Sequence, residues 1–180
     1  MRAGGGHAKG AAFERQVCDH LSRWVDPRGT DTHFWRSSMS GGRATIKHRA
    51  GKLTKSQAGD LSSLTRIGHP LLSKFFVECK FVKDLSIQGA LISRKGLLAS
   101  YWYVLEVEAA KHDKLPLMIA KENRSPTLLF CLPQSAKFLG AVSLLEVACF
   151  KRLSRKGTPV ACFIFDEFLA NVKYAAHRFT

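Results

Sequence analysis

The spacing of apolar residues indicates where this chain forms helices. From residue 9 to residue 24, apolar side chains recur at intervals of three or four residues, as in Phe13, Val17 and Leu21. This spacing places them on one side of a helix, so the segment predicts an amphipathic helix. Residues 96–111 show the same pattern, with Leu98 and Trp102 on the apolar side.

Short runs rich in β-branched and aromatic residues lie between and after these two helices. The order of helix, several strands, helix and further strands is typical of an α/β domain with a central mixed β-sheet flanked by helices. The segment 134–155 is ambiguous, and its middle, 144–153, fits a helix. We expect strands at 33–36, 60–64, 74–80, 116–121, 127–132 and 161–165, and a short helix at 166–173.

The charge of the chain restricts its partners. Its 180 residues include 28 Lys and Arg against 14 Asp and Glu, which gives a net charge of +14. Such a field attracts polyanions, and nucleic acid is the first candidate. A membrane surface or an acidic protein would fit the charge equally well, so charge alone names no partner. The length suits a single domain, expected at 9–180 after a disordered glycine-rich start at 1–8.

The basic residues are most isolated from acidic ones in one segment. No Asp or Glu occurs from Thr32 to Gly59, and glycine and serine are frequent there. We expect a flexible basic loop at about 38–58, and we favour DNA contact over a merely solvated linker. The candidate DNA-binding residues of this segment are Arg36, Arg43, Lys47, Arg49, Lys52 and Lys55.

The spacing of the cysteines and the lack of long apolar segments predict the cellular compartment. The five cysteines are widely spaced and form no Cys-x-x-Cys pair, which argues against a zinc ribbon. We expect all five to be buried free thiols in a reducing cytosol. No transmembrane segment or signal peptide is recognisable, so we expect a cytoplasmic protein without membrane contact.

The triple Glu78-Cys79-Lys80 lies in the strand expected at 74–80. Side chains alternate along a strand, so Glu78 and Lys80 point to one face while Cys79 points to the core. Phosphodiester hydrolysis uses carboxylates that bind Mg²⁺ and a lysine that orients water or stabilises developing charge. The carbonyl of Cys79 could add a metal ligand. Taken alone, the triple is explained better by an ordinary salt bridge.

Two further carboxylates could lie close to Glu78. Asp60 opens the strand expected at 60–64, and a hairpin between that strand and the one at 74–80 would place Asp60 beside Glu78. Glu14 borders the apolar stripe of the first helix and could point to the same place. The alternatives are an ordinary Gly-Asp turn for Asp60 and a helix-surface position for Glu14.

The set Glu14, Gly59-Asp60 and Glu78-Cys79-Lys80 resembles the PD-(D/E)XK nuclease superfamily. Within it, the pattern resembles archaeal and phage Holliday junction resolvases and related phage endonucleases. The similar segments are Lys-Gly-Ala-Ala-Phe-Glu-Arg at 9–15, the Arg-Ser-Gly-rich run at 36–42, and residues 116–124. The resemblance covers about 9–132 and implies a restriction-endonuclease-like αβββαβ core. It leaves a C-terminal extension at about 133–180.

The resemblance also implies roles for individual residues. Asp60 and Glu78 would bind Mg²⁺ or Mn²⁺, with Glu14 as a further ligand, and Lys80 would act on the attacking water. Ser37 or Ser38 matches a resolvase serine that touches the scissile phosphate. The implied protein is a homodimeric DNA endonuclease acting on branched or duplex DNA. Open alternatives are a restriction-like or nicking enzyme and a DNA-binding protein without catalysis. Gly59 replaces the proline of the motif.

Overall fold

The structure is a computed structural model that describes residues 5–37, 59–87, 90, 96–140, 149–150 and 157–179. The expected basic loop lies outside these residues, and so do the following candidate DNA-binding residues: Ser38, Arg43, Lys47, Arg49, Lys52 and Lys55.

The first helix, α1 (Gly5–Val25), begins four residues before the expected start at residue 9. The predicted apolar stripe is confirmed, because Phe13, Val17 and Leu21 are all buried. The helix ends at a turn in which the Gly29 N–H donates to the Asp26 carboxylate at 3.0 Å. Asp26 therefore closes the helix end, as the Asp-Pro-Arg-Gly sequence favours.

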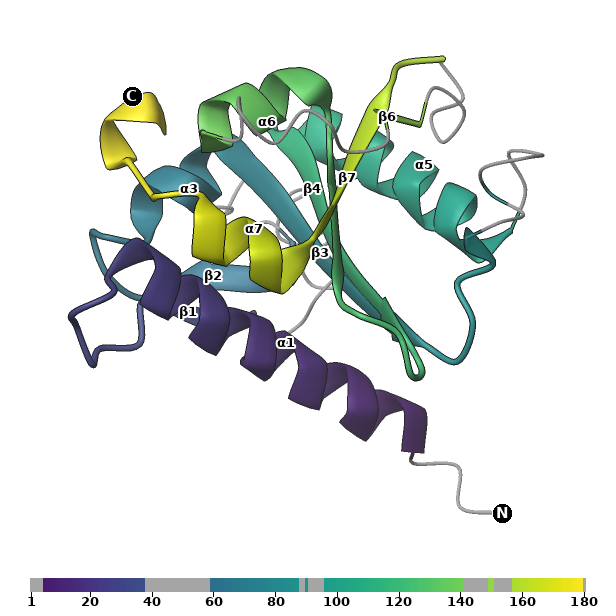
Figure 1. The fold of residues 1–180 in the computed structure, drawn as a ribbon, viewed down its shortest axis with the longest axis horizontal. Coiled ribbons are helices and arrows are strands. Elements are labelled where there is room, and N and C mark those ends of the chain that lie inside the picture. Colours follow the sequence, from purple (N-terminus) through teal and green to yellow (C-terminus); the bar gives the residue numbers. More distant parts are fainter. Residues whose placement is uncertain are drawn as a thin grey trace.

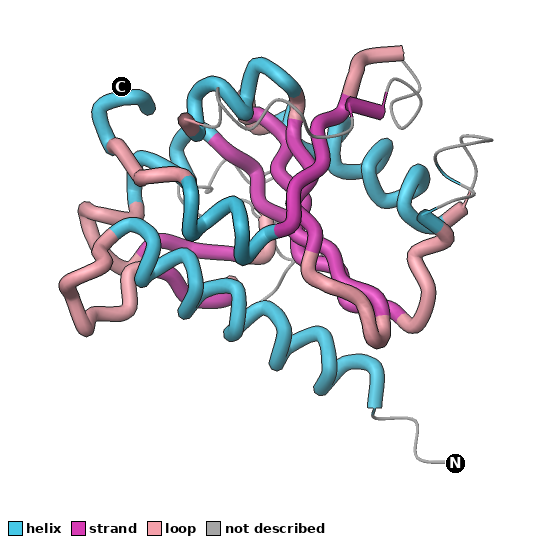
Figure 2. The backbone as a smooth tube through the Cα atoms, viewed as in Figure 1, coloured by secondary structure: helices cyan, strands magenta, loops and turns pink. Residues whose placement is uncertain are grey.

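A small hairpin stands apart from the main sheet (Figure 2). Strand β1 (Phe34–Arg36) pairs antiparallel with β2 (Leu61–Ser63). The hydroxyl of Ser22 on α1 accepts the Phe34 N–H at 3.2 Å, which ties the hairpin to the helix. Helix α3 (His69–Lys74) follows and was not predicted, because Pro70 suggested an interruption. Proline is instead well suited to the first turn of a helix, where its missing N–H costs no hydrogen bond.

The central sheet has the strand order β3-β4-β5-β7-β6, with β3 at one edge. The β3–β4 pair is parallel and the other pairs are antiparallel, so the predicted mixed sheet is confirmed. The strands are β3 (Phe75–Val82), β4 (Leu115–Glu122), β5 (Leu128–Cys131), β6 (Cys149–Phe150) and β7 (Val160–Ile164).

Helices cover both faces of this sheet (Figure 1). Helix α5 (Leu97–Lys111) connects the parallel strands β3 and β4 and buries Trp102 against Phe76 and Met118. On the opposite face, α1 packs with α6 (Pro133–Leu139), α7 (Phe165–Asn171) and the inward side of β3. The chain ends in a short 3₁₀ helix, Ala176–Phe179. The architecture is therefore the α/β sandwich that the sequence predicts.

The last third of the chain contributes directly to the sheet. Strand β7 pairs with β5 over four residue pairs. Cys149 and Phe150 form β6, whereas the sequence suggested a helix over 144–153; the rest of that expected helix lies outside the described residues. A short apolar run does not distinguish a buried strand from a buried helix, which explains the error.

The structure describes the state of four of the cysteines. Cys18, Cys79 and Cys131 are buried free thiols, and Cys162 is free but only half-buried. No helix in the part of the chain that the structure describes is long and apolar enough to cross a membrane.

Candidate functional site

Asp60 is bonded to the exposed edge of β3. Its N–H donates to the Val77 carbonyl at 2.9 Å, and its carboxylate Oδ2 accepts the Cys79 N–H at 2.8 Å. The expected hairpin between the strand at 60–64 and β3 is wrong, because β2 pairs with β1 and α3 separates it from β3. Because α3 connects β2 to β3, the segment at Gly59 runs parallel to β3, and the two form a parallel bridge between Gly59 and Val77. The predicted proximity of Asp60 to the Glu78 strand is nevertheless present.

The backbone around Gly59 allows this close approach. Gly59 has φ of +94°, and a Cβ built there would lie 2.5 Å from the Val77 carbonyl oxygen. Ser37 holds the same dipeptide from the other side, since its hydroxyl donates to the Gly59 carbonyl at 2.7 Å and its N–H to the Asp60 carbonyl at 2.7 Å. A proline, fixed near φ of −65°, cannot adopt this conformation. The geometry therefore explains why glycine precedes Asp60 in this chain.

Glu78 and Lys80 lie on the same side of β3, as strand alternation predicts. Their side chains form an ion pair and are 24% and 28% exposed. The Lys80 Nζ also lies 5.4 Å from the ring centroid of Tyr101 on α5. Burial lowers the pKa of Lys80, but the Glu78 carboxylate outweighs it and holds that pKa above its usual value. Lys80 is thus a fixed positive charge beside a carboxylate.

Cys79 takes the opposite orientation to its two neighbours. Its thiol packs in the core beneath α1, as expected, and burial raises its pKa well above the usual value. The N–H and C=O of one strand residue point to the same side, and the Cys79 N–H points to Asp60. The Cys79 carbonyl is therefore directed from the sheet edge toward the region of Asp60.

The Asp60 carboxyl group is buried close to other negative charges. It is 3% exposed. Burial, and then the Glu78 carboxylate, raise its pKa from 3.8 to about 7; the Cys79 N–H and Lys80 offset part of this, and Glu14 adds a smaller increase. Two carboxylates that disfavour each other's charge are the usual surroundings of a bound cation.

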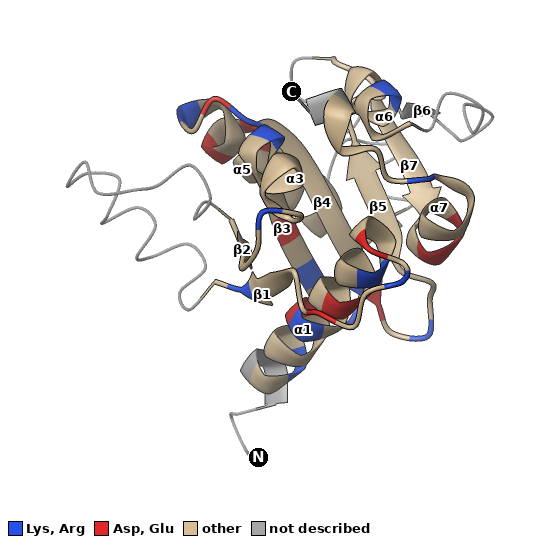
Figure 3. Cartoon of the chain, turned by 90° about the vertical axis from the view of Figure 1, so that its left-hand side faces the viewer, with Lys and Arg blue, Asp and Glu red and all other residues tan. Residues whose placement is uncertain are grey.

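Glu14 points inward, as expected, but it is engaged by an arginine. Its carboxylate is 12% exposed and accepts a hydrogen bond from the Nε of Arg36 at 2.9 Å. Arg36 was predicted to contact DNA, so the structure brings two candidate site residues into one ion pair. Figure 3 shows acidic and basic positions gathered where α1, β1 and β3 meet.

The oxygen donors of the candidate site suit a hard cation that keeps several waters, and they do not form a site closed by protein ligands alone. Within the described ranges, no group of three or more His, Cys, Asp and Glu side chains lies close enough to hold a metal ion. Mg²⁺ is usually held by one or two carboxylates and keeps several waters. The two carboxylates of Asp60 and Glu78, together with the Cys79 carbonyl, match that requirement.

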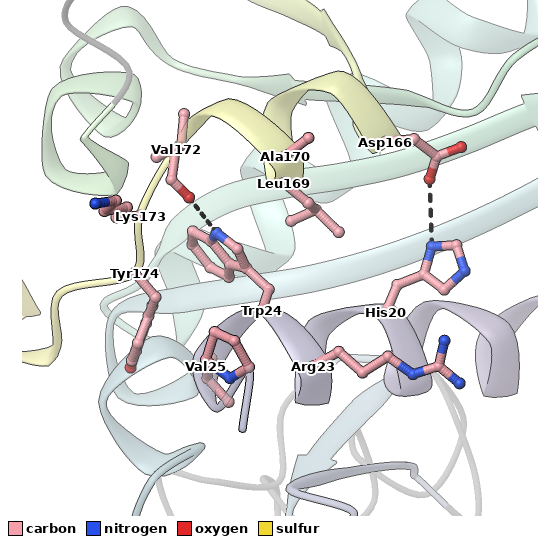
Figure 4. A pocket seen from close by; sticks show the side chains of 11 residues that line it. His20, Arg23, Trp24, Val25, Asp166, Leu169, Ala170, Val172, Lys173 and Tyr174 are labelled. Carbon is pink, nitrogen blue, oxygen red and sulfur yellow. Dashed lines mark hydrogen bonds and ion pairs between the residues drawn. The ribbon is translucent and has the colours of Figure 1, made fainter. Parts of the chain in front are cut away.

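One pocket lies elsewhere, between α1 and α7, and contains none of these residues (Figure 4). Two contacts join its lining residues: Trp24 Nε1 donates to the Val172 carbonyl at 2.5 Å, and His20 Nδ1 lies 3.3 Å from the Asp166 carboxylate. We assign it no part in the candidate site.

Comparison with known proteins identifies the family. Residues 5–173 match the family described as "Phage putative PDDEXK endonuclease", and the chain belongs to it. The match extends past residue 132, where the resemblance noted in the sequence ended. No curated protein and no solved structure is significantly similar to the chain.

Ser37, Gly59 and the backbone of β3 together hold Asp60, and we call this arrangement the Asp60 clamp. Sequence reasoning did not predict it. Ser37 was considered only as a phosphate contact, and Gly59 only as a departure from the motif. The signal available was a glycine beside a candidate catalytic aspartate, since glycine is the residue that tolerates positive φ and close backbone approach.

Proposed function

We propose that this protein is a Mg²⁺-dependent DNA endonuclease whose site is formed by Asp60, Glu78 and Lys80. The observation that carries the proposal is the attachment of Asp60 to β3: the Cys79 N–H that binds Asp60 lies between Glu78 and Lys80 in sequence. Membership of a PD-(D/E)XK endonuclease family and a net charge of +14 support it further.

Each residue has a distinct proposed role. Asp60, Glu78 and the Cys79 carbonyl would hold the cation. When bound, Mg²⁺ would neutralise phosphate charge and lower the pKa of a coordinated water. Lys80, held by Glu78 and backed by Tyr101, would orient the attacking water by hydrogen bonding. Mn²⁺ would suit the same oxygen donors.

Glu14 and Arg36 would act as a pair at the border of the site. Glu14 would bind the cation through water, with Arg36 fixing its carboxylate. The guanidinium group has five N–H donors, so Arg36 can hold Glu14 and a phosphate together. Ser37 or Ser38 would contact the scissile phosphate, and Arg43, Lys47, Arg49, Lys52 and Lys55 would add sequence-independent phosphate contacts.

The finer proposal is a resolvase-like enzyme acting on branched DNA in the cytoplasm of the host cell. Two symmetric cuts in a four-way junction require two related sites, which a two-fold homodimer provides. The alternatives are a restriction-like or nicking enzyme on duplex DNA, and a DNA-binding protein without catalysis. These alternatives predict different products from the same chain.

A cleavage assay separates these alternatives. Labelled four-way junction, duplex and single-stranded DNA are incubated with Mg²⁺ and with wild type, Glu78→Gln or Glu108→Gln. Glu108 is a matched control because it is also paired with a lysine, Lys111, but lies on α5 outside the site. Loss of activity in Glu78→Gln alone supports the site. Symmetric junction cuts support the resolvase, and duplex cuts support the other enzymes. Binding without cleavage by wild type would refute the catalytic proposal.

A further inference from the structure

The ammonium groups of two lysines from distant parts of the chain lie near the ring of Phe81, the residue that follows Lys80. The Nζ of Lys9 on α1 lies 3.7 Å from the centroid of the Phe81 ring, and the Nζ of Lys121 on β4 lies 5.7 Å from it. Phe81 and Lys121 are register neighbours in the parallel pair. We call Lys9 and Lys121 the Phe81 lysine pair.

Neither ammonium group is neutralised by a carboxylate among the described residues. Lys9 donates instead to the neutral amide oxygen of Asn123 at 2.5 Å. Two acids near in sequence are already bonded elsewhere: Glu122 accepts the Leu85 N–H at 2.9 Å, and Glu14 accepts from Arg36. Two like charges are thus held close to one ring, and an anion bound near the ring would be attracted by both.

The ring and the asparagine also restrict the movement of Lys9. A lysine otherwise loses considerable rotamer entropy when it binds a ligand. Packing on Phe81 and bonding to Asn123 reduce that loss before any ligand arrives. The pair therefore resembles a prepared anion site more than a solvated patch.

The lysine pair lies on the α1 face of β3, together with Cys79 and Glu14, whereas Glu78 and Lys80 point to the other face of the strand. The Phe13 ring contacts the Phe81 ring at 5.5 Å between centroids, and Phe13 directly precedes Glu14 on α1. Lys9 and Glu14 are five residues apart, a rise of about 7.5 Å along a helix.

We propose that the Phe81 lysine pair binds a backbone phosphate of the DNA substrate that flanks the phosphate being cut. The inference rests on the proposed function, since it takes DNA as the ligand. A phosphodiester carries the single negative charge and the oxygen acceptors that two ammonium groups require. The contact is sequence-independent and fixes the position of the strand along α1.

The test measures DNA binding without cleavage. Fluorescence anisotropy with a labelled duplex, in the presence of a chelator, gives Kd against salt concentration for wild type, Lys9→Gln, Lys121→Gln and the double variant. Each lost lysine contact should reduce the slope of log K against log salt by about 1. If the electrostatic contribution vanishes near 1 M, Kd at about 0.15 M salt should rise about fivefold per lysine and about thirtyfold for the double variant.

Lys74→Gln is the matched control. Lys74 also lies over a phenylalanine ring, with its Nζ 4.9 Å from the Phe138 centroid, but it precedes β3 at the opposite end of the strand. It should change Kd less than twofold. The double variant Lys9→Arg, Lys121→Arg keeps both charges and should retain the slope of log K against log salt. Thermal denaturation verifies that each variant is folded. If Lys9→Gln does not fold, the comparison of Lys121→Gln with wild type tests the proposal.

The outcomes separate the two proposals. Glutamine variants that bind no worse than Lys74→Gln, from a wild type that binds DNA, would overturn the lysine-pair inference and leave the nuclease proposal intact. A wild type that binds no DNA at any salt concentration would overturn both. Selective weakening, with recovery in the arginine variant, would support the site.

Discussion

Replacing Gly59 with alanine should displace Asp60 from β3. The added Cβ would lie 2.5 Å from the Val77 carbonyl oxygen and 3.1 Å from the Val77 nitrogen. Val77 is fully buried and belongs to a strand paired with β4, so β3 cannot move away easily. Residue 59 must move instead, and Asp60 moves with it.

The cost follows from the contacts that would be lost. Alanine at φ of +94° is disfavoured by about 1–2 kcal/mol. Losing the Asp60 N–H bond to Val77 costs about 1 kcal/mol, and losing the Cys79 N–H bond to the carboxylate costs about 2 kcal/mol. We expect about 4 kcal/mol of lost stability. A misplacement of 1 Å at a catalytic group lowers activity about 100-fold, so cleavage should fall by at least that factor.

Gly157→Ala provides the control for backbone strain. Gly157 also has positive φ, +72°, but a Cβ there would meet nothing within 4 Å. It should therefore show only the strain of about 1–2 kcal/mol and normal activity. Urea denaturation and initial cleavage rates are measured for both variants. If Gly59→Ala is no less stable than Gly157→Ala and cuts DNA at the wild-type rate, the clamp does not position Asp60.

Three further predictions concern other groups. In metal-free protein, the raised pKa of Asp60 means that folding takes up a proton between about pH 4 and about pH 7. The free energy of unfolding should therefore fall as the pH rises from about 4 to about 7, by up to about 1.4 kcal/mol per pH unit. Asp60→Asn should flatten this profile, and an unchanged slope in the variant would contradict the prediction. Burial raises the pKa values of Cys18 and Cys162 to about 12, so alkylation of native protein at pH 8, followed by mass spectrometry, should leave both thiols unmodified; rapid labelling would contradict this. Gly10→Ala, inside α1 with open space at its Cβ, should raise the free energy of unfolding by about 1 kcal/mol and raise the Tm; a lower Tm would contradict this.

Local periodicity predicted the elements that carry the site. The apolar spacing of α1 and the β-forming run of β3 were recognisable, so the orientation of Glu78 and Lys80 followed from strand alternation alone. Glu14 was also expected to face inward, and its low exposure agrees with this.

Pairings between distant segments could not be predicted in the same way. Nothing in the pattern of residues 60–64 indicates that β2 pairs with β1 and not with β3. The Glu14–Arg36 ion pair joins residues 22 positions apart, and the Asp60–Cys79 bond joins residues 19 apart. Such contacts depend on packing between elements and not on the pattern within one.

The separation of the β1–β2 hairpin from the main sheet has a consequence for inactivation. Asp60 directly precedes β2 of the hairpin and is joined to β3 by hydrogen bonds, whereas Glu78 lies within a strand of the five-stranded sheet. Segments of low local stability open before the whole domain unfolds. Detachment of the hairpin would withdraw one carboxylate while the core around Trp102 stays intact. Mild heating should therefore abolish cleavage before the tertiary structure melts, and cooling should restore it without refolding of the sheet.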